Sequence, residues 1–222
     1  MFIVPGEGLV GYFPLDGDAS DAGSNHIDHE IIGMVDFTSI DCNTKERSTA
    51  TFDGASLISI TDNGAMNFET SNLTIGVWIR SISTSRIMVY QESGSGGPGD
   101  PQTWFRFNDN SGSRVVRAAM EDSSGSAILN ISDADLPGGL ADDTWHFVTI
   151  VRERNDLRVY VDGVLIGSRT GALKDVSSEQ NFSLGAQTSG DPFSNYYTGQ
   201  IDDLILFKRA LTEPEILALY QL

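Results

Sequence analysis

Hydrophobic and polar residues alternate in short runs along nearly the whole chain, and clusters of Gly, Asp, Asn and Ser separate these runs. Such alternation is typical of β-strands, because successive side chains of a strand point to opposite faces. No helical segments alternate with these runs, which excludes a parallel α/β fold. The pattern predicts about fourteen strands, at residues 9–15, 30–35, 49–52, 57–60, 72–80, 86–91, 103–107, 114–120, 127–131, 145–152, 157–161, 164–168, 181–185 and 199–207.

Two local patterns predict specific elements. Asp162-Gly163 lies between two alternating runs and supplies the two positive-φ positions of a type I′ turn, which predicts a β-hairpin over residues 157–167. Near the C-terminus, Thr212 can cap a helix, Glu215 completes a capping box, and Pro214 is tolerated in the first turn. This is the one helix that the sequence predicts, so the helix content should stay below about 10%.

The composition is that of a globular protein with an acidic surface. Of the 222 residues, 40% are hydrophobic, enough for a full core, and the formal net charge is −17. No linker divides the chain, and all-β sandwiches of this length often form one unit, so residues 1–222 are predicted to be a single domain. The negative charge argues against nucleic-acid binding and against a polybasic membrane anchor. No apolar run reaches the roughly 20 residues of a membrane span.

Cysteine content and the N-terminal residues leave the compartment open. Cys42 is the only cysteine, which excludes an intramolecular disulfide and a zinc site built from cysteines. Residues 1–7 lack the basic and apolar regions of a signal peptide. Neither observation decides between inside and outside the cell, because secreted bacterial domains often have no disulfide and a leader can be missing from the sequence.

Sequence motifs of enzymes are not found. Residues 94–99 match G-x-G-x-x-G, but Pro98 and the strand-like run that follows leave no helix to hold a pyrophosphate, so the segment is interpreted as a loop. The chain has neither the G-x-S-x-G motif of serine hydrolases nor the H-E-x-x-H motif of zinc proteases. The E-x-D-x-x-E segment of retaining β-glucanases does not occur either. The sequence therefore gives no support to an enzyme, without excluding one.

An acidic segment near the N-terminus is the best candidate for a metal site. Asp16, Asp18 and Asp21 lie within six residues, and Gly17 lets the backbone turn between them. Carboxylate and carbonyl oxygens are the ligands that calcium prefers, although the segment lacks the terminal Glu and the flanking helices of an EF-hand. Taken alone, the segment fits either a calcium loop or a solvated acidic turn.

The same segment opens a series of motifs that resembles a known family. Residues 9–21, with the sequence LVGYFPLDGDASD, resemble the start of the concanavalin A-like LamG (laminin G-like) jelly-roll domains. Further segments resemble motifs of that family in the same order, at residues 48–54, 73–79, 145–150, 160–164 and 199–211. The resemblance spans residues 9–220 and implies an all-β fold, a two-sheet antiparallel jelly-roll sandwich with a short C-terminal helix.

The resemblance also implies a structural calcium ion, Ca2+. In the family, the first and last strands pair, and an aspartate of the Ile-Asp-Asp motif lies beside the N-terminal loop; here that residue is Asp202. The implied ligands are Asp16, Asp18, Asp21 and Asp202. Strand alternation would send Asp202 and Asp203 to opposite faces, so only one of them should bind the ion directly.

Residues that bind a ligand are sought outside the family motifs. Trp104 lies outside them, beside the Gly-rich loop, where it fits a ligand platform and a core position equally well. An aromatic ring flanked by planar hydrogen-bonding side chains is typical of sugar-binding sites. Strand alternation places Arg106 and Asn108 on the same face as Trp104. Arg117 and Tyr90 lie on neighbouring strands, and Tyr196 lies in a rim loop. The candidate ligand-binding residues are Trp104, Arg106, Asn108, Arg117, Tyr90 and Tyr196.

Members of this family are mainly non-catalytic modules of extracellular proteins, which leads to three hypotheses. The first is a lectin-like, carbohydrate-binding module that recognises a cell-surface glycan, outside the cell or at its surface. The second is an adhesion or structural module of a larger surface or virion protein, which an exposed apolar patch would favour. The third is a glycoside hydrolase or polysaccharide lyase, which needs two carboxylates or a Tyr/His pair with shifted pKa values.

Overall fold

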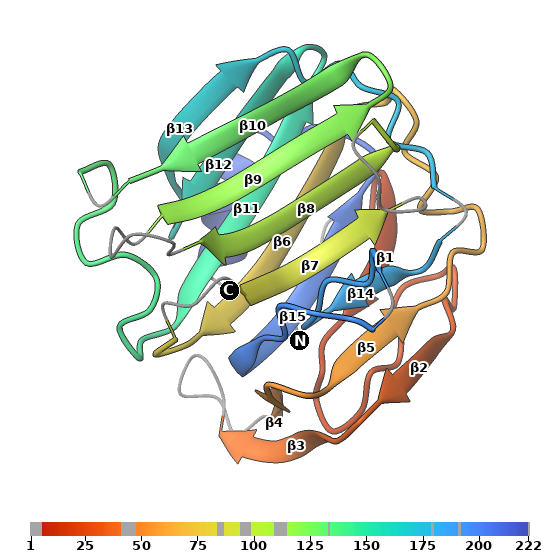
Figure 1. Cartoon of the computed structure of the whole chain (residues 1–222), viewed down its shortest axis with the longest axis vertical. Helices are drawn as coiled ribbons and strands as arrows, with labels where there is room; N and C mark the ends of the chain where they lie inside the picture. Colours follow the sequence, from red (N-terminus) through yellow and green to blue (C-terminus); the bar gives the residue numbers. More distant parts are fainter. Residues whose placement is uncertain are drawn as a thin grey trace.

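The computed structural model of the chain describes residues 6–40, 48–83, 87–93, 99–108, 115–132, 134–178, 180–190 and 192–221. Cys42 and most of the Gly-rich segment 94–99 lie outside the described residues. The described residues form two antiparallel β-sheets that face each other, with one helix near the C-terminus (Figure 1).

The first sheet has seven strands in the spatial order β10-β9-β8-β7-β14-β5-β2 and lies at the front of Figure 1. Its strands are β2 (His29–Ile32), β5 (Leu57–Ile60), β7 (Ile87–Ser93), β8 (Gln102–Asn108), β9 (Val115–Asp122), β10 (Gly125–Ile131) and β14 (Phe182–Leu184). Each pair of neighbouring strands is antiparallel.

The second sheet has eight strands, seven of them in the order β13-β12-β11-β6-β15-β4-β3, and β1 pairs with β15 outside this path. Its strands are β1 (Leu9–Phe13), β3 (Val35–Ile40), β4 (Ser48–Asp53), β6 (Leu73–Arg80), β11 (His146–Glu153), β12 (Asp156–Val161), β13 (Val164–Thr170) and β15 (Thr198–Phe207). The first and last strands are therefore neighbours, as the resemblance implies.

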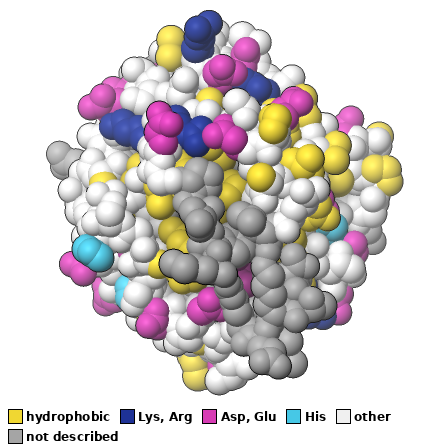
Figure 2. Space-filling model, turned by 180° about the vertical axis from the view of Figure 1, so that it is seen from behind, with side chains coloured by type: hydrophobic (Ala, Val, Ile, Leu, Met, Phe, Trp, Pro, Cys, Tyr) yellow, Lys and Arg dark blue, Asp and Glu magenta, His cyan; other side chains and the backbone are white. Residues whose placement is uncertain are grey.

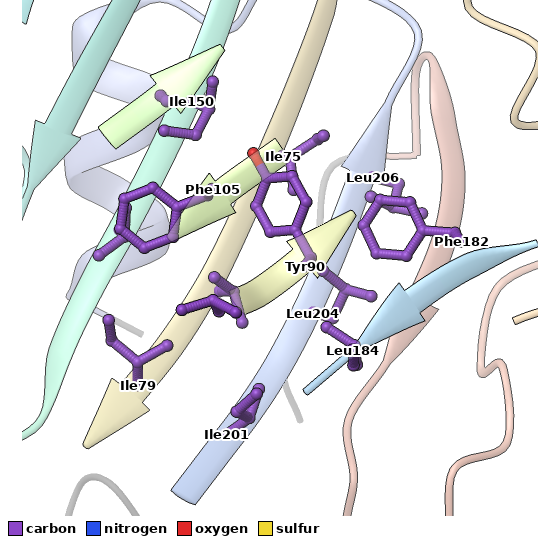
Figure 3. Close-up of a cluster of buried hydrophobic side chains, with 14 of the residues drawn as sticks. Ile75, Ile79, Tyr90, Phe105, Ile150, Phe182, Leu184, Ile201, Leu204 and Leu206 are labelled. Atoms are coloured by element: carbon purple, nitrogen blue, oxygen red, sulfur yellow. The ribbon is translucent and has the colours of Figure 1, made fainter. Parts of the chain in front are cut away.

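The main hydrophobic core fills the space between the two sheets (Figure 3). Ile75 and Ile150 extend into it from the eight-stranded sheet, and Tyr90, Phe105 and Phe182 extend from the seven-stranded sheet; each is at most 1% exposed. Full burial of one such apolar side chain stabilises a protein by roughly 1.5–3 kcal/mol. The alternating pattern forms a sandwich because each strand contributes one of its two faces to this core.

The helix α1 (Glu213–Tyr220) covers a second apolar cluster on the outer face of the eight-stranded sheet. Ile216 and Leu219 are buried there with Trp78 and other aromatic and aliphatic side chains. The capping box is confirmed, and the Thr212 amide donates a hydrogen bond to the Glu215 carboxylate at 2.8 Å. The outer face of the eight-stranded sheet is thus partly closed by the chain's own helix.

The structure confirms the predicted all-β jelly-roll fold and the hairpin, and corrects one strand. Asp162 and Gly163 have φ angles of +52° and +78° between β12 and β13, as a type I′ turn requires. The predicted strand over residues 30–35 is wrong, because Gly33 adopts a φ of +81° and breaks it. The pieces before and after Gly33, β2 and β3, belong to different sheets.

Acidic side chains are spread over the surface that faces away from the seven-stranded sheet (Figure 2). This distribution agrees with the formal net charge of −17. Within the described part of the chain, no helix is both long and apolar enough to cross a membrane.

Candidate ligand-binding face

The outer face of the seven-stranded sheet brings several predicted ligand residues together. On β8, Phe105 and Phe107 belong to the main core, so Trp104 and Arg106 lie on the opposite, outer face. Trp104 packs there against apolar side chains of β7 and β9. This face, which α1 does not cover, is the candidate ligand-binding face.

The indole of Trp104 is held in place by polar contacts and is almost fully buried. Its Nε1 donates a hydrogen bond to Glu121 Oε1 at 2.9 Å. The guanidinium carbon of Arg106 lies 4.3 Å from the ring centroid, and that of Arg117 lies 5.5 Å away. Trp104 is only 4% exposed. A ligand that approaches this face therefore meets guanidinium groups stacked on an indole, an arrangement stabilised by cation–π attraction.

The two arginines are direct cross-strand neighbours, because Arg106 of β8 pairs with Arg117 of β9. Like charges directly opposite each other in a sheet are destabilising. The electron-rich face of the Trp104 ring and the Glu121 carboxylate at its edge offset part of this repulsion. Arg106 is 8% exposed, and Arg117 is half-buried. The arrangement brings two guanidinium groups to one ring.

The buried carboxamide of Gln91 lies on the strand next to Trp104. Gln91 of β7 pairs with Trp104 and is 1% exposed. Its Oε1 accepts a hydrogen bond from the Thr188 amide at 3.1 Å, and its Nε2 donates to Ser189 Oγ at 3.3 Å. Gln91 thus ties the loop after β14 to the sheet and fixes the polar groups beside the indole.

Tyr90 is a correction to the predicted ligand set, because it lies in the main core and is 0% exposed. Its ring stacks on Phe182 with centroids 5.3 Å apart, and burial raises the pKa of its hydroxyl. A register shift between Met88 and Tyr90, a β-bulge, turns Tyr90 inward and brings Gln91 to the outer face. Gln91 could not be found from the sequence for the same reason, since unbroken alternation would place it in the core.

No described contact joins the other two predicted ligand residues, Tyr196 and Asn108, to Trp104. Tyr196 is half-buried in the loop before β15, next to the fully buried Tyr197. Asn108 is the last residue of β8, and its side chain lies outside the described part of the chain. We therefore define the candidate face by Trp104, Arg106, Arg117, Glu121 and Gln91.

The predicted calcium ligands lie partly at the surface and partly in local hydrogen bonds. Asp16 and Asp18 are exposed. Asp21 Oδ1 accepts hydrogen bonds from the Tyr12 and Gly23 amides at 2.9 and 2.8 Å, and Asp21 Oδ2 accepts one from the Ile27 amide at 3.0 Å. Across residues 6–221, apart from the gaps in the description, no three His, Cys, Asp or Glu side chains converge as metal ligands.

Asp202 and Asp203 do not lie on opposite faces of β15, which corrects the alternation argument. A register shift lies between Asp202 and Ile205, and Asp203 has a φ of +45°. Asp202 pairs with Trp78, and Asp203 Oδ1 accepts a hydrogen bond from the Tyr12 hydroxyl at 2.7 Å. Trp78 and Tyr12 both belong to the cluster beneath α1, so both carboxylates lie on that outer side.

His146 bridges two aspartates in a structural arrangement. Its Nδ1 lies 2.9 Å from Asp162 Oδ2, and its Nε2 lies 3.2 Å from Asp142 Oδ1. Burial alone would lower the pKa of His146, but the bonds to Asp162 and Asp142 outweigh it and raise the pKa. Asp162 Oδ1 also accepts a hydrogen bond from the Phe147 amide at 2.8 Å. The contacts of Asp162 therefore hold the β12–β13 turn against β11.

Solved structures of two kinds share this fold. The binding domain of Paraclostridial Mosquitocidal Protein 1 aligns with a TM-score of 0.74 and 18% identity, over 96% of this chain and 52% of that one. Domain 4 of AbnA, a GH43 extracellular arabinanase from Geobacillus stearothermophilus, in complex with arabinotriose, aligns with a TM-score of 0.72 and 17% identity, over 96% of this chain and 98% of that one.

A third structure, the binding domain of Botulinum Neurotoxin DC in complex with SialylT, aligns with a TM-score of 0.71 and 15% identity, over 96% of this chain and 51% of that one. The chain thus spans about half the length of these toxin binding domains. No curated protein matches the chain in sequence. The family model described as the concanavalin A-like lectin/glucanases superfamily (Laminin_G_3) matches residues 52–217. The chain belongs to this family.

Proposed function

We propose that this chain is a non-catalytic carbohydrate-binding module that binds its glycan on the candidate face. The observation that carries the proposal is Trp104, an indole on the outer face of the sheet surrounded by the planar polar groups of Arg106, Arg117 and Gln91. Guanidinium groups hydrogen-bond to sugar hydroxyls in defined directions, the aromatic ring anchors them, and the buried Gln91 holds the strand beside them. The sheet holds all four side chains in fixed register, so little conformational entropy is lost on binding.

Two of the similar structures support a sugar ligand. AbnA domain 4 is described in complex with arabinotriose, and the neurotoxin binding domain in complex with SialylT. AbnA is also described as extracellular. By this analogy of fold, we propose that the chain acts outside the cell or at its surface, on a glycan displayed there.

The carboxylate of Glu121 on the candidate face favours binding over hydrolysis. Retaining glycosidases need two carboxyl groups about 5–5.5 Å apart. Glu121, the carboxylate that contacts Trp104, is held in a hydrogen bond to the indole Nε1. The E-x-D-x-x-E strand segment of retaining β-glucanases does not occur in the sequence.

The distribution of exposed apolar side chains favours a glycan over a protein partner. None of the large exposed apolar side chains in the described part of the chain lies on β7, β8 or β9. They are spread over β2, β13, α1 and loops, rather than gathered on the candidate face: Ile31, Met34, Ile82, Val164, Leu165, Leu173, Phe193 and Leu217.

Replacing Trp104 with alanine should weaken glycan binding by at least about 1 kcal/mol, or roughly fivefold in Kd, because Arg106 and Arg117 lose the ring that holds their guanidinium groups in place. A glycan array identifies the ligand, and isothermal titration then compares the wild type, Trp104→Ala and Tyr220→Ala. The control removes a half-buried aromatic ring on α1, beside Trp78 on the opposite sheet, and should leave the affinity unchanged. Circular dichroism of each variant separates loss of binding from loss of fold.

Other outcomes would contradict this function in different ways. Equal affinity of the wild type and a folded Trp104→Ala variant would move the ligand site to another face. Steady product formation from a bound glycan, followed by mass spectrometry, would make the protein an enzyme. An array without any hit would leave the adhesion hypothesis, with a protein as the partner.

We propose calcium binding separately, from the family resemblance alone. Calcium at about 100 times its Kd should add roughly 2.7 kcal/mol to the free energy of unfolding. Thermal melts in EDTA and then in excess calcium measure this for the wild type, Asp202→Ala and the control Asp62→Ala. Asp62 accepts a hydrogen bond from the Gly64 amide and is not one of the proposed ligands, so this control should respond like the wild type, whereas Asp202→Ala should not. A wild-type midpoint indifferent to calcium would leave the aspartates with local roles.

A further inference from the structure

The side chain of His146 joins two loops of the chain. His146 is the first residue of β11, and its side chain is 15% exposed. Its Nδ1 lies 2.9 Å from Asp162 Oδ2 in the β12–β13 turn, and its Nε2 lies 3.2 Å from Asp142 Oδ1 in the loop between β10 and β11. The imidazole therefore has a carboxylate oxygen at each of its two nitrogens.

The protonation state of His146 decides whether both contacts can form. In the charged imidazolium each nitrogen carries a proton, so the ring can donate to Asp162 and to Asp142 at the same time. A neutral imidazole has a single N–H, and its other nitrogen would face a carboxylate oxygen with no proton between them. Loss of the proton therefore costs one of the two contacts.

The hydrogen bonds around the two aspartates decide which contact is lost. Asp162 is fixed to β11, because its Oδ1 accepts a hydrogen bond from the Phe147 amide at 2.8 Å and its own amide donates to the Phe147 carbonyl at 2.9 Å. Asp142 Oδ1 instead accepts from its own loop, from the Thr144 amide at 2.9 Å and the Thr144 hydroxyl at 2.8 Å. A neutral His146 should therefore keep its proton on Nδ1, toward Asp162, and lose Asp142.

We infer that His146 is a proton-controlled latch, which ties the β10–β11 loop to the β12–β13 turn when it is charged and releases the loop at Asp142 when it is neutral. The Thr144 hydroxyl, 3.0 Å from Nε2, can then turn and donate to the neutral ring. The latch is a property of the fold itself and does not depend on the proposed function.

The charged groups around the ring favour its protonated form. On the neighbouring strand β6, His146 pairs with the apolar Ile79, and the adjacent Arg80 forms an ion pair with Asp143 at 3.0 Å. Burial alone would lower the pKa of His146, but the hydrogen bonds and charges of Asp162 and Asp142 raise it above its ordinary value of about 6.5.

The latch should be closed in mildly acidic solution. A group whose pKa is higher in the folded protein than in the unfolded chain stabilises the fold below the unfolded value, and this stabilisation is lost as the pH rises through the folded value. Asp142 stays ionised in this range, because hydrogen bonds from Thr144 and the contact with His146 outweigh burial and lower its pKa. The contribution of His146 is therefore present at mildly acidic pH and lost at alkaline pH.

Thermal melts of the wild type and His146→Asn at about pH 5.5 and about pH 8.5 measure this contribution. Asparagine keeps a donor for Asp162 but cannot take up a proton. The midpoint of the wild type should exceed that of the variant by a margin that is larger at the acidic pH by at least about 2 °C. Circular dichroism confirms that each variant is folded.

Asp142→Asn tests which contact is released. Asparagine keeps an oxygen for the Thr144 donors but removes the negative charge from Nε2, so the variant should lower the midpoint at the acidic pH and much less at the alkaline pH. The matched control is Asp36→Asn, because Asp36 Oδ1 accepts hydrogen bonds from the Thr38 amide and hydroxyl at 2.8 and 2.7 Å in the same Asp-x-Thr arrangement. This control should change the midpoint equally at both pH values.

A proton NMR titration of His146 reads the latch without relying on a variant. The ring should titrate above about pH 6.5 in the wild type, and at a lower pH in Asp142→Asn. A wild-type ring that titrates at or below this value would overturn the latch, and so would an equal margin over His146→Asn at both pH values. Equal effects of Asp142→Asn at both pH values would overturn the release at Asp142.

Discussion

Replacing Arg152 with methionine should lower the free energy of unfolding by at least about 3 kcal/mol, because a buried cation that donates several hydrogen bonds is lost. Arg152 on β11 is 0% exposed. Its Nε donates to the Ser71 carbonyl and its Nη1 to the Lys174 carbonyl, each at 2.7 Å, and its Nη2 donates to the Glu69 carbonyl at 2.8 Å. Methionine fills a similar volume but leaves these carbonyls without their donor.

The control is Arg158→Met on the neighbouring strand β12. Arg158 forms an ion pair with Glu153 at the surface, and its side chain is 23% exposed. Exposed ion pairs are worth about 0–1 kcal/mol, so this variant should unfold within about 1 kcal/mol of the wild type. Urea denaturation compares the two variants. Similar losses for Arg152→Met and Arg158→Met would show that the Arg152 contacts do not hold the loops to the sheet.

Gly199→Ala should destabilise the protein by at least about 2 kcal/mol, because it combines backbone strain with a steric clash. Gly199 begins the last-strand motif and has a φ of +147°. A Cβ at this position would lie 2.3 Å from the Arg80 carbonyl oxygen of the paired strand β6. The two central strands of the eight-stranded sheet would have to move apart locally.

The matched control is Gly171→Ala, which isolates the backbone contribution. Gly171 has a φ of +108°, and a Cβ there would meet nothing within 4 Å. Its loss of stability, measured by the same urea titration, should be clearly smaller than that of Gly199→Ala. Equal losses would mean that the close approach to Arg80 contributes nothing, and that only the φ angle matters.

Most of the fold could be predicted because its signals are local. The alternating runs, the Asp162-Gly163 turn and the Thr212 capping box each depend on residues a few positions apart. The two-sheet arrangement, with the first and last strands paired, was implied by the family motifs rather than by periodicity. Gly33 was missed because a single glycine inside an alternating run can either continue a strand or send it to the other sheet.

The candidate site could be predicted only as far as strand alternation holds. Trp104 and Arg106 lie on one face because β8 pairs regularly with β9. After the bulge between Met88 and Tyr90 on β7, the side chains that alternation would place outside point into the core, and those expected inside point outward. The register shift after Asp202 has the same effect on β15. A bulge inserts one residue without a distinctive residue type, so alternation alone assigns the wrong face beyond it.

The pairing of β1 with β15 has a practical consequence for attaching this protein to other objects. The Gly8 carbonyl accepts a hydrogen bond from the Lys208 amide at 2.8 Å, so the residues before the first strand and those after the last strand lie together. Both flank strands of the eight-stranded sheet, whereas Trp104 lies on the seven-stranded sheet. A bead or carrier joined through either end should therefore present the seven-stranded sheet outward. Many copies displayed in this way could bind a glycan-coated surface with an avidity far above the affinity of one copy.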